Sequence, residues 1–257
     1  MALTFSSLDQ GARIARRLAL AGLTLAAACG AAELLAGLGY RWGWWHFRTG
    51  LSIMRWAATT DLAAVLLALV ATSLAWKSGA RHVALLAVQG LALSLIVGGL
   101  PLYLYREVST VPRIHDISTD TDNPPRFVAV LPLRRGVENA ADYTADVAKQ
   151  QKQGYPDIGP ALLDVAPPQA LQRAEHAVRA MGWDIVAVVP ADGRIEATDT
   201  TLLFGFKDDV VIRVTPGATG SRVDVRSLSR VGRSDFGTNA KRIRRFMQQL
   251  EAAKAGG

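Results

Sequence analysis

The stretch that decides the fold of the second half of the chain is Trp183–Leu228, WDIVAVVPADGRIEATDTTLLFGFKDDVVIRVTPGATGSRVDVRSL. It holds four runs rich in β-branched and aromatic residues, separated by short segments of turn-forming residues such as Asp192-Gly193. Breaks this short favour hairpins between neighbouring strands. The sequence therefore predicts a four-stranded antiparallel meander with strands at Trp183–Val189, Ile195–Phe206, Val210–Thr215 and Arg222–Leu228.

Helical patterns flank this meander. Pro167-Pro168 suits the first turn of a helix, and an apolar stripe follows from Leu171 to Met181 before Gly182 ends it. A second stripe predicts a helix over about Gly237–Ala253. We therefore expect an α+β domain with both helices on one face of the sheet. Upstream, residues 140–153 favour a helix, and residues 126–133 indicate a short strand or an ordered loop.

The first half of the chain has a different composition. Residues 1–105 contain 11 charged side chains, against 40 in residues 106–257. Three apolar stretches, at about residues 18–40, 56–76 and 83–105, are each close to the ~20 residues that cross a bilayer. We therefore predict a three-helix transmembrane region over 1–105, a connector over 106–125 and a soluble domain over 126–257. Cys29 follows three alanines, as at a lipoprotein cleavage site, but apolar sequence continues to Leu38 and favours a span.

The side of the membrane follows from charge near the spans. Arg13, Arg16 and Arg17 precede the first span and favour a cytoplasmic N-terminus. Three spans then place the soluble domain on the opposite side, in the periplasm of a bacterium whose inner membrane holds the helices. Counted over all span ends, these three arginines included, lysines and arginines number five on each side, so the total count does not add to this expectation.

Polar residues inside the apolar stretches are few. Apart from serines and threonines they are Glu33, Asp61 and Gln89, one in each stretch. A carboxylate within a span costs on the order of 3 kcal/mol, so these side chains should face protein or water. Hydrogen bonding between helices accounts for them more simply than a transport path.

Searches for enzyme motifs are negative. The chain has no G-x-S-x-G, P-loop, G-x-G-x-x-G, H-E-x-x-H or C-x-x-C motif, and its four histidines are scattered. A single cysteine excludes an intrachain disulfide and a cysteine-based metal site. The formal net charge of +7 lies mostly on the membrane half, which argues against nucleic-acid binding. We expect no cofactor and no metal.

One charged stretch is unusual. Residues 222–245 carry eight basic and two acidic side chains. An anionic ligand held by Arg230, Arg233 and the start of the last helix is one explanation. The alternative is that connector carboxylates pair with these arginines, and that the charges of 241–245 form a solvated helix face. The carboxylates available for such pairing are Asp116, Asp120 and Asp122.

Two segments resemble a known family. Ser227–Ile243, SLSRVGRSDFGTNAKRI, resembles the signature of the domain of unknown function 1499 family. Ile114–Phe127, IHDISTDTDNPPRF, is similar to the corresponding segment of its membrane-anchored proteobacterial members, and Asp209–Val214 also fits. The resemblance covers roughly residues 110–252 and implies no reaction. It implies that one local structure is formed by Ser229, Arg230, Arg233, Ser234, Asp235 and Asn239.

These observations predict a binding or scaffolding module of the cell envelope, with the lipid bilayer and an anionic lipid or a partner protein as its contacts. The competing hypothesis is a membrane-anchored hydrolase that uses Asp116 or Asp235 with Ser229 or Ser234. It requires a carboxylate and a hydroxyl that converge in a pocket. The sequence favours the non-catalytic role and leaves the oligomeric state open.

Overall fold

The computed structural model describes residues 2–252. Those residues form two compact units, one running through Glu107 together with Leu203–Gly205, and one formed by the rest of the chain from Val108. The prediction of three long apolar helices followed by an α+β domain is confirmed.

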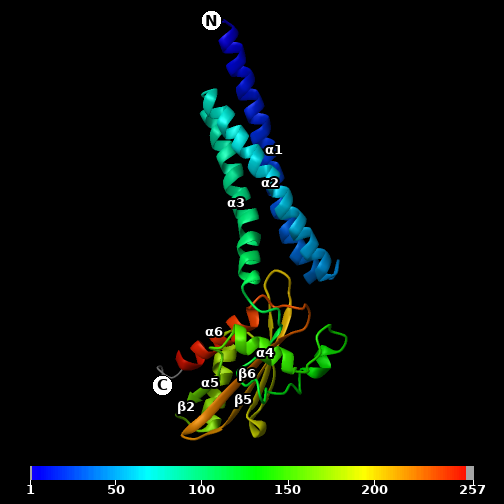
Figure 1. Ribbon diagram of the computed structural model, residues 1–257, viewed down its shortest axis with the longest axis vertical. Coiled ribbons are helices and arrows are strands. Elements are labelled where there is room, and N and C mark those ends of the chain that lie inside the picture. The colour runs from blue at the N-terminus through cyan, green and yellow to red at the C-terminus, as the bar shows by residue number, and fades with distance from the viewer. Residues whose placement is uncertain (1, 253–257) are drawn as a thin grey trace. The chain divides into compact units, whose positions relative to one another are not determined.

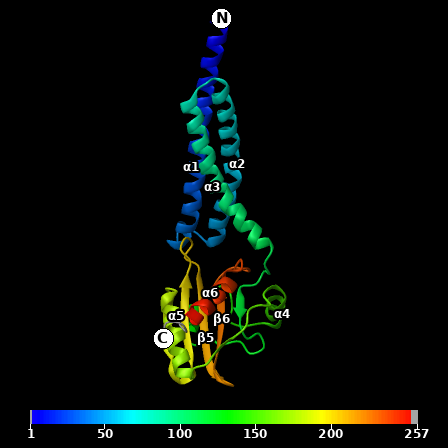
Figure 2. The ribbon, with the colours of Figure 1, turned by 90° about the vertical axis from the view of Figure 1, so that its left-hand side faces the viewer.

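The first unit consists of three helices, α1 (Ala2–Arg41), α2 (Phe47–Lys77) and α3 (Arg81–Ser109), which lie side by side (Figures 1 and 2). Each contains a stretch long and apolar enough to cross a membrane. All three helices extend beyond the apolar stretches seen in the sequence. Trp56 and Trp76 lie 20 residues apart on α2 with exposed rings, a spacing that suits the two interfaces of a bilayer.

The second unit is built on one antiparallel sheet in which β1 (Asp116–Ser118), β6 (Gly220–Ser229), β5 (Lys207–Gly217), β4 (Arg194–Thr200) and β3 (Asp184–Val189) follow in that order. A sixth strand, β2 (Ala161–Leu163), also pairs with β6. The predicted meander is therefore correct, but the predicted count of four strands is wrong. The two additional strands are three residues long, too short for an alternating pattern to reveal them.

The edge of β6 is covered by these two short strands. β1 pairs with residues 226–228 of β6, and β2 pairs with residues 221–223. An unpaired strand edge exposes backbone hydrogen-bonding groups, so the pairing removes an aggregation-prone edge.

The helices α5 (Pro167–Ala180) and α6 (Thr238–Ala252) cover one face of the sheet, as the sequence predicts (Figure 2). Their apolar stripes pack on inward side chains of the central strands, such as Ile195, Ile212 and Val225. At the end of α5, Gly182 has φ +72°, a conformation that glycine adopts without strain.

The opposite face of the sheet is covered by the segment between β1 and α4 (Ala145–Gly154). Residues 126–133 form an extended loop that leads into a 3-10 helix, Leu131–Arg134. Phe127 and Val130 pack there on Val211 of β5 and Leu228 of β6. α4 lies beside β1, where the Gln151 side chain donates to and accepts from the backbone of Ser118.

Candidate functional site

The covered face of the sheet is lined with paired charges. Arg226 of β6 forms two hydrogen bonds to the carboxylate of Asp116, with N···O distances of 2.9 and 2.7 Å, and both side chains are buried. Arg213 and Arg222 share the carboxylates of Asp120 and Asp224 at 2.9–3.1 Å. Two of the three connector aspartates thus pair with arginines of the sheet.

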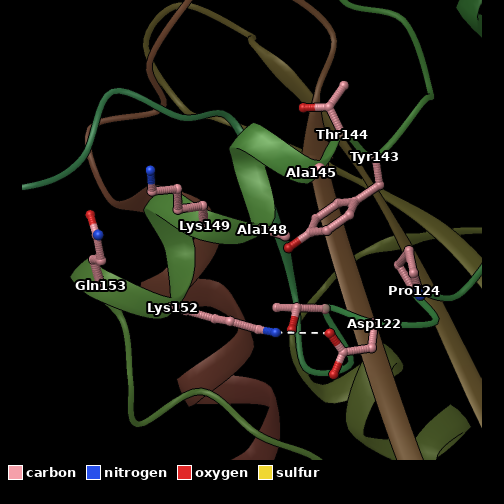
Figure 3. Close-up of a pocket in the computed structure, with 10 residues that line it drawn as sticks. Asp122, Pro124, Tyr143, Thr144, Ala145, Ala148, Lys149, Lys152 and Gln153 are labelled. Atoms are coloured by element: carbon pink, nitrogen blue, oxygen red, sulfur yellow. Dashed lines mark hydrogen bonds and ion pairs between the residues drawn. The ribbon is translucent and has the colours of Figure 1, made fainter.

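Asp122 behaves differently from its two neighbours. It forms an exposed ion pair with Lys152 of α4 at 2.8 Å and contacts no arginine. The pair borders an open pocket of about 650 Å³ between the connector and α4 (Figure 3). Tyr143 also lines this pocket, and its hydroxyl donates to Gln151 Oε1 at 2.8 Å. Asp122 and Lys152 thus pair with each other, and the Tyr143 hydroxyl is bound to a buried side chain outside the pocket lining.

Arg230 is held within the protein. Its guanidinium forms two hydrogen bonds to Asp209, at 3.0 and 2.8 Å, and Arg134 binds the same carboxylate at 2.5 Å. Asp209 has no exposed surface. The Arg230 guanidinium is therefore not free to bind an anionic ligand.

Asp235 lies three residues before the start of helix α6. Its two carboxylate oxygens accept hydrogen bonds from the backbone N–H groups of Gly237 and Asn239, at 2.8 and 2.9 Å. This is the arrangement of a capping residue, which satisfies amides that lack helical partners. Burial raises the pKa of Asp235, and the two backbone hydrogen bonds act in the opposite direction.

Asn239 and Ser229 belong to a second internal network. The Asn239 amide donates to the Ser229 hydroxyl at 2.9 Å and to the carbonyl of His115 at 3.0 Å. Its carbonyl accepts from the Ser227 hydroxyl and from Arg242. Asn239 is fully buried, so this network joins α6, β6 and the segment before β1 without reaching solvent.

The expectation of a solvated helix face over residues 241–245 is wrong for Arg242. This side chain is buried, and it pairs with Asp199 of β4 at 2.7 Å and Asp208 of β5 at 2.5 Å. Residue 242 lies one turn from Asn239 and Phe246 on the inner face of α6, and the facing carboxylates make its burial possible.

Arg233 and Phe236 remain at the surface of the loop between β6 and α6, Arg230–Gly237. Both side chains are exposed, and no carboxylate in the described residues pairs with Arg233. Phe236 has φ +58°, a backbone conformation that a bulky side chain adopts only at a cost. Ser234 lies between them, and its hydroxyl accepts a hydrogen bond from the Phe236 N–H at 3.3 Å.

The same end of the sheet receives the chain from α3. The Asp235 N–H donates to the carbonyl of Ile114, five residues after α3 ends. The residue that this loop contacts is therefore joined to α3 by a short connector in the chain. The turn between β4 and β5 is also at this end of the sheet, and there Leu202 is 89% exposed.

No catalytic pair forms among the predicted hydrolase residues. Asp116 is bound to Arg226, and Asp235 is used as a helix cap. Ser229 accepts from Asn239, and Ser234 accepts from the backbone. Neither carboxylate is hydrogen-bonded to either hydroxyl, although the hydrolase hypothesis requires such a pair. Within residues 2–252, no group of His, Cys, Asp and Glu side chains has the arrangement of a metal site.

The structure also reveals groups that sequence reasoning missed. The buried Glu196 carboxylate accepts hydrogen bonds from the backbone N–H groups of residues 128–130 and pairs with Arg194. Arg134 reaches Asp209 from 75 positions away in the chain. For the exposed Leu202 and Phe236 the one sequence signal was an apolar residue close to a glycine, Gly205 three positions after Leu202 and Gly237 directly after Phe236.

The comparisons with known proteins agree with the resemblance noted in the sequence. A search of the curated proteins found no match for this chain. The family model described as "Protein of unknown function (DUF1499)" matches residues 116–250, more than half of the chain. The chain therefore belongs to this family.

Proposed function

We propose that this DUF1499 protein is a non-catalytic, membrane-anchored binding module whose Arg230–Gly237 loop binds anionic lipid headgroups of the membrane that holds its helices. The observation that carries the proposal is Phe236, whose exposed ring stands beside exposed Arg233 on a backbone at φ +58°. Phe236 is 47% exposed, so its strained conformation keeps about half of an apolar ring in contact with solvent, which points to a contact outside the domain.

The chemistry of the loop suits a membrane interface. Aromatic rings favour the headgroup region, and a guanidinium binds phosphate oxygens through two hydrogen bonds. Ile114, whose carbonyl accepts from the Asp235 N–H, follows α3 by five residues, so a short connector tethers the domain that carries the loop to the membrane-spanning region. Leu202, at the same end of the sheet, supplies a second apolar contact.

We further propose that the membrane is the inner membrane of a bacterium and that the soluble domain is periplasmic. Arg13, Arg16 and Arg17 before the first span and the presence of three candidate spans support this orientation. A periplasm-active phosphatase and a cytoplasm-fluorescent protein, fused in turn after the last residue, test it. Phosphatase activity without fluorescence is expected, and the reverse would contradict the orientation.

Lipid binding is tested on the full chain in vesicles of zwitterionic lipid, with and without anionic phospholipid. We expect anionic lipid to slow amide hydrogen exchange of residues 230–237. Arg233→Ala should weaken this protection about fivefold, since one arginine near an anionic surface contributes about 1 kcal/mol. Arg233→Ala combined with Phe236→Gly should remove it. Arg245→Ala is the matched control, because Arg245 is an exposed arginine of α6 outside the loop.

Three outcomes overturn the proposal. Protection that is equal with and without anionic lipid excludes headgroup binding. If Arg233→Ala and Arg245→Ala reduce the protection of residues 230–237 equally, anionic lipid attracts the whole domain without specificity for the loop. Protection that appears only when envelope proteins are added identifies a protein partner instead of lipid.

A further inference from the structure

The three membrane helices meet along seams of small residues. Along each helix, the buried residues of the seam recur at alternating intervals of four and three positions. This spacing is typical of helices that wind around one another. In chain order they are Ala15, Ala19, Gly22, Ala26 and Cys29 of α1, Ala57, Asp61, Ala64, Ala68, Ala71 and Ala75 of α2, and Val83, Ala87, Gly90, Ser94 and Val97 of α3. Two of these seam positions are polar, Asp61 and Ser94.

Glu33 continues the seam of α1. It lies four residues after Cys29 and three before the buried Ala36. Each helix therefore contributes one polar residue to a run of small or apolar ones: Glu33 from α1, Asp61 from α2 and Ser94 from α3. Gln89, the polar residue that the sequence singled out on α3, is exposed and lies off the seam.

The polar atoms at this level lack partners. Asp61 and Ser94 are each only 1% exposed. Asp61 Oδ1, Ser94 Oγ and Glu33 Oε1 are buried without a hydrogen bond of good geometry, and the Ser94 hydroxyl is the one neutral donor near Asp61 among the described residues. Gly98, one turn after Ser94, leaves room for the carboxylate, because a Cβ there would lie 3.1 Å from Asp61 Oδ2. A buried carboxylate that faces a neutral hydroxyl and no counter-charge is costly unless it is itself neutral.

The electrostatic surroundings offer no counter-charge. The titratable groups close to Asp61 are Glu33 and the thiol of Cys29, both on α1. The facing residues of α3 are the neutral Ser94 and Gly98. In the part of the bundle that the structure describes, no lysine or arginine pairs with either carboxylate. Two neighbouring carboxylates in a medium of low dielectric constant cannot both remain ionised.

We propose that Glu33 and Asp61 form a proton-binding site inside the helix bundle, which holds at least one proton at neutral pH. The bound proton removes one of two adjacent buried charges and turns one carboxyl into a hydrogen-bond donor. The protonated pair is the form that packs. Deprotonation at alkaline pH leaves two negative charges between the helices and weakens their association.

The test uses the full chain in zwitterionic vesicles and a hydrophobic carbodiimide, which attacks protonated carboxyl groups in apolar surroundings. Modified residues are identified by peptide mass spectrometry between about pH 6 and about pH 10. We expect modification of Asp61 or Glu33 at pH 7 that declines about tenfold for each pH unit above its midpoint. Sodium ions should not protect either residue. Asp9 and Asp116, outside the apolar core of the bundle, serve as internal controls and should stay unmodified.

Two variants separate pairing from simple burial. Asp61→Asn removes the like charge beside Glu33, so modification of Glu33 should be lost at a lower pH than in the wild type. Glu33→Gln should shift modification of Asp61 in the same direction. Midpoints that do not move would contradict a coupled pair.

Sodium protection at constant pH would assign the site to an alkali cation and overturn the proton assignment. If the reagent modifies neither residue, infrared spectroscopy tests whether one of the two carboxyl groups is protonated. The C=O stretch of a protonated carboxyl group should be present at pH 7 and absent from the Glu33→Gln, Asp61→Asn double variant. No such band in the wild type would overturn the proposal.

Discussion

At the scale of single residues, Asp209 shows how the domain keeps a charge inside. Burial alone would raise the pKa of this carboxyl, but hydrogen bonds from Arg230, Thr198 and Arg134 outweigh it and hold the pKa below its usual range. A folded-state pKa that is depressed adds stability above the unfolded pKa, near 4. That contribution is lost as the pH falls through the lower, folded-state pKa.

Asp209→Asn should therefore have a pH-dependent effect. At pH 7 we expect the free energy of unfolding of the soluble domain to fall by about 3–5 kcal/mol, because two buried arginines lose their counter-charge. As the pH falls below about 4 the difference from the wild type should narrow, since the unfolded wild-type carboxyl is protonated first and the folded one only at its lower pKa. Pulse proteolysis of the full chain in urea measures both values.

The control for this substitution is Asp122→Asn, which breaks an exposed pair and should change stability by less than about 1 kcal/mol. A difference between Asp209→Asn and the wild type that is the same at both pH values would contradict the explanation.

At the scale of elements, the segment from β1 to α4 is fixed to the sheet by charge. Arg226 binds the Asp116 carboxylate and also donates to the carbonyls of Pro125 and Ala141. One β6 side chain thus joins β1 to two separate points of the covering segment. This segment is the reason that most of the arginine-rich stretch is internal structure.

Arg226→Met should loosen that segment selectively. The substitution leaves Asp116 buried without a counter-charge, at a cost of about 3–5 kcal/mol. We expect amide hydrogen exchange to accelerate over residues 116–143 more than over β3 and β4. Arg245→Met, on the exposed face of α6, is the matched control and should leave exchange unchanged. Uniform acceleration across the whole domain would show that Arg226 supports the fold globally and not this segment.

The helices and strands also show how much of the fold the sequence could predict. The meander strands and the two covering helices were predictable because each is long enough to show a period of two or 3.6 residues. β1 and β2 are too short for this. The burial of Arg242, Arg134 and Glu196 was not predictable, because their partners lie at distant positions in the sequence, and a polarity pattern cannot distinguish a paired charge from a solvated one. For the same reason, the sequence did not reveal that Ser94 of α3 lies in the buried seam between the helices.

For the whole molecule, the two ends of the sheet differ in what they expose. The end of the sheet that receives the chain from α3 carries the exposed Leu202, Arg233 and Phe236, and we propose that this end meets the lipid surface. The turn between β5 and β6, with exposed Thr219, lies at the opposite end of the same strands. The two ends of one rigid sheet thus provide a test site and its control.

The most direct measurement is quenching of a fluorescent label by lipid-attached quenchers in vesicles that contain anionic lipid. Because Cys29 is the chain's one cysteine, Cys29→Ser gives a background for single labels at Leu202→Cys, Ser234→Cys and Thr219→Cys. If the end of the sheet that carries Leu202 and Arg233 meets lipid, quenching should be strong at positions 202 and 234 and weak at 219. Equal quenching at all three positions, or stronger quenching at 219, would contradict it.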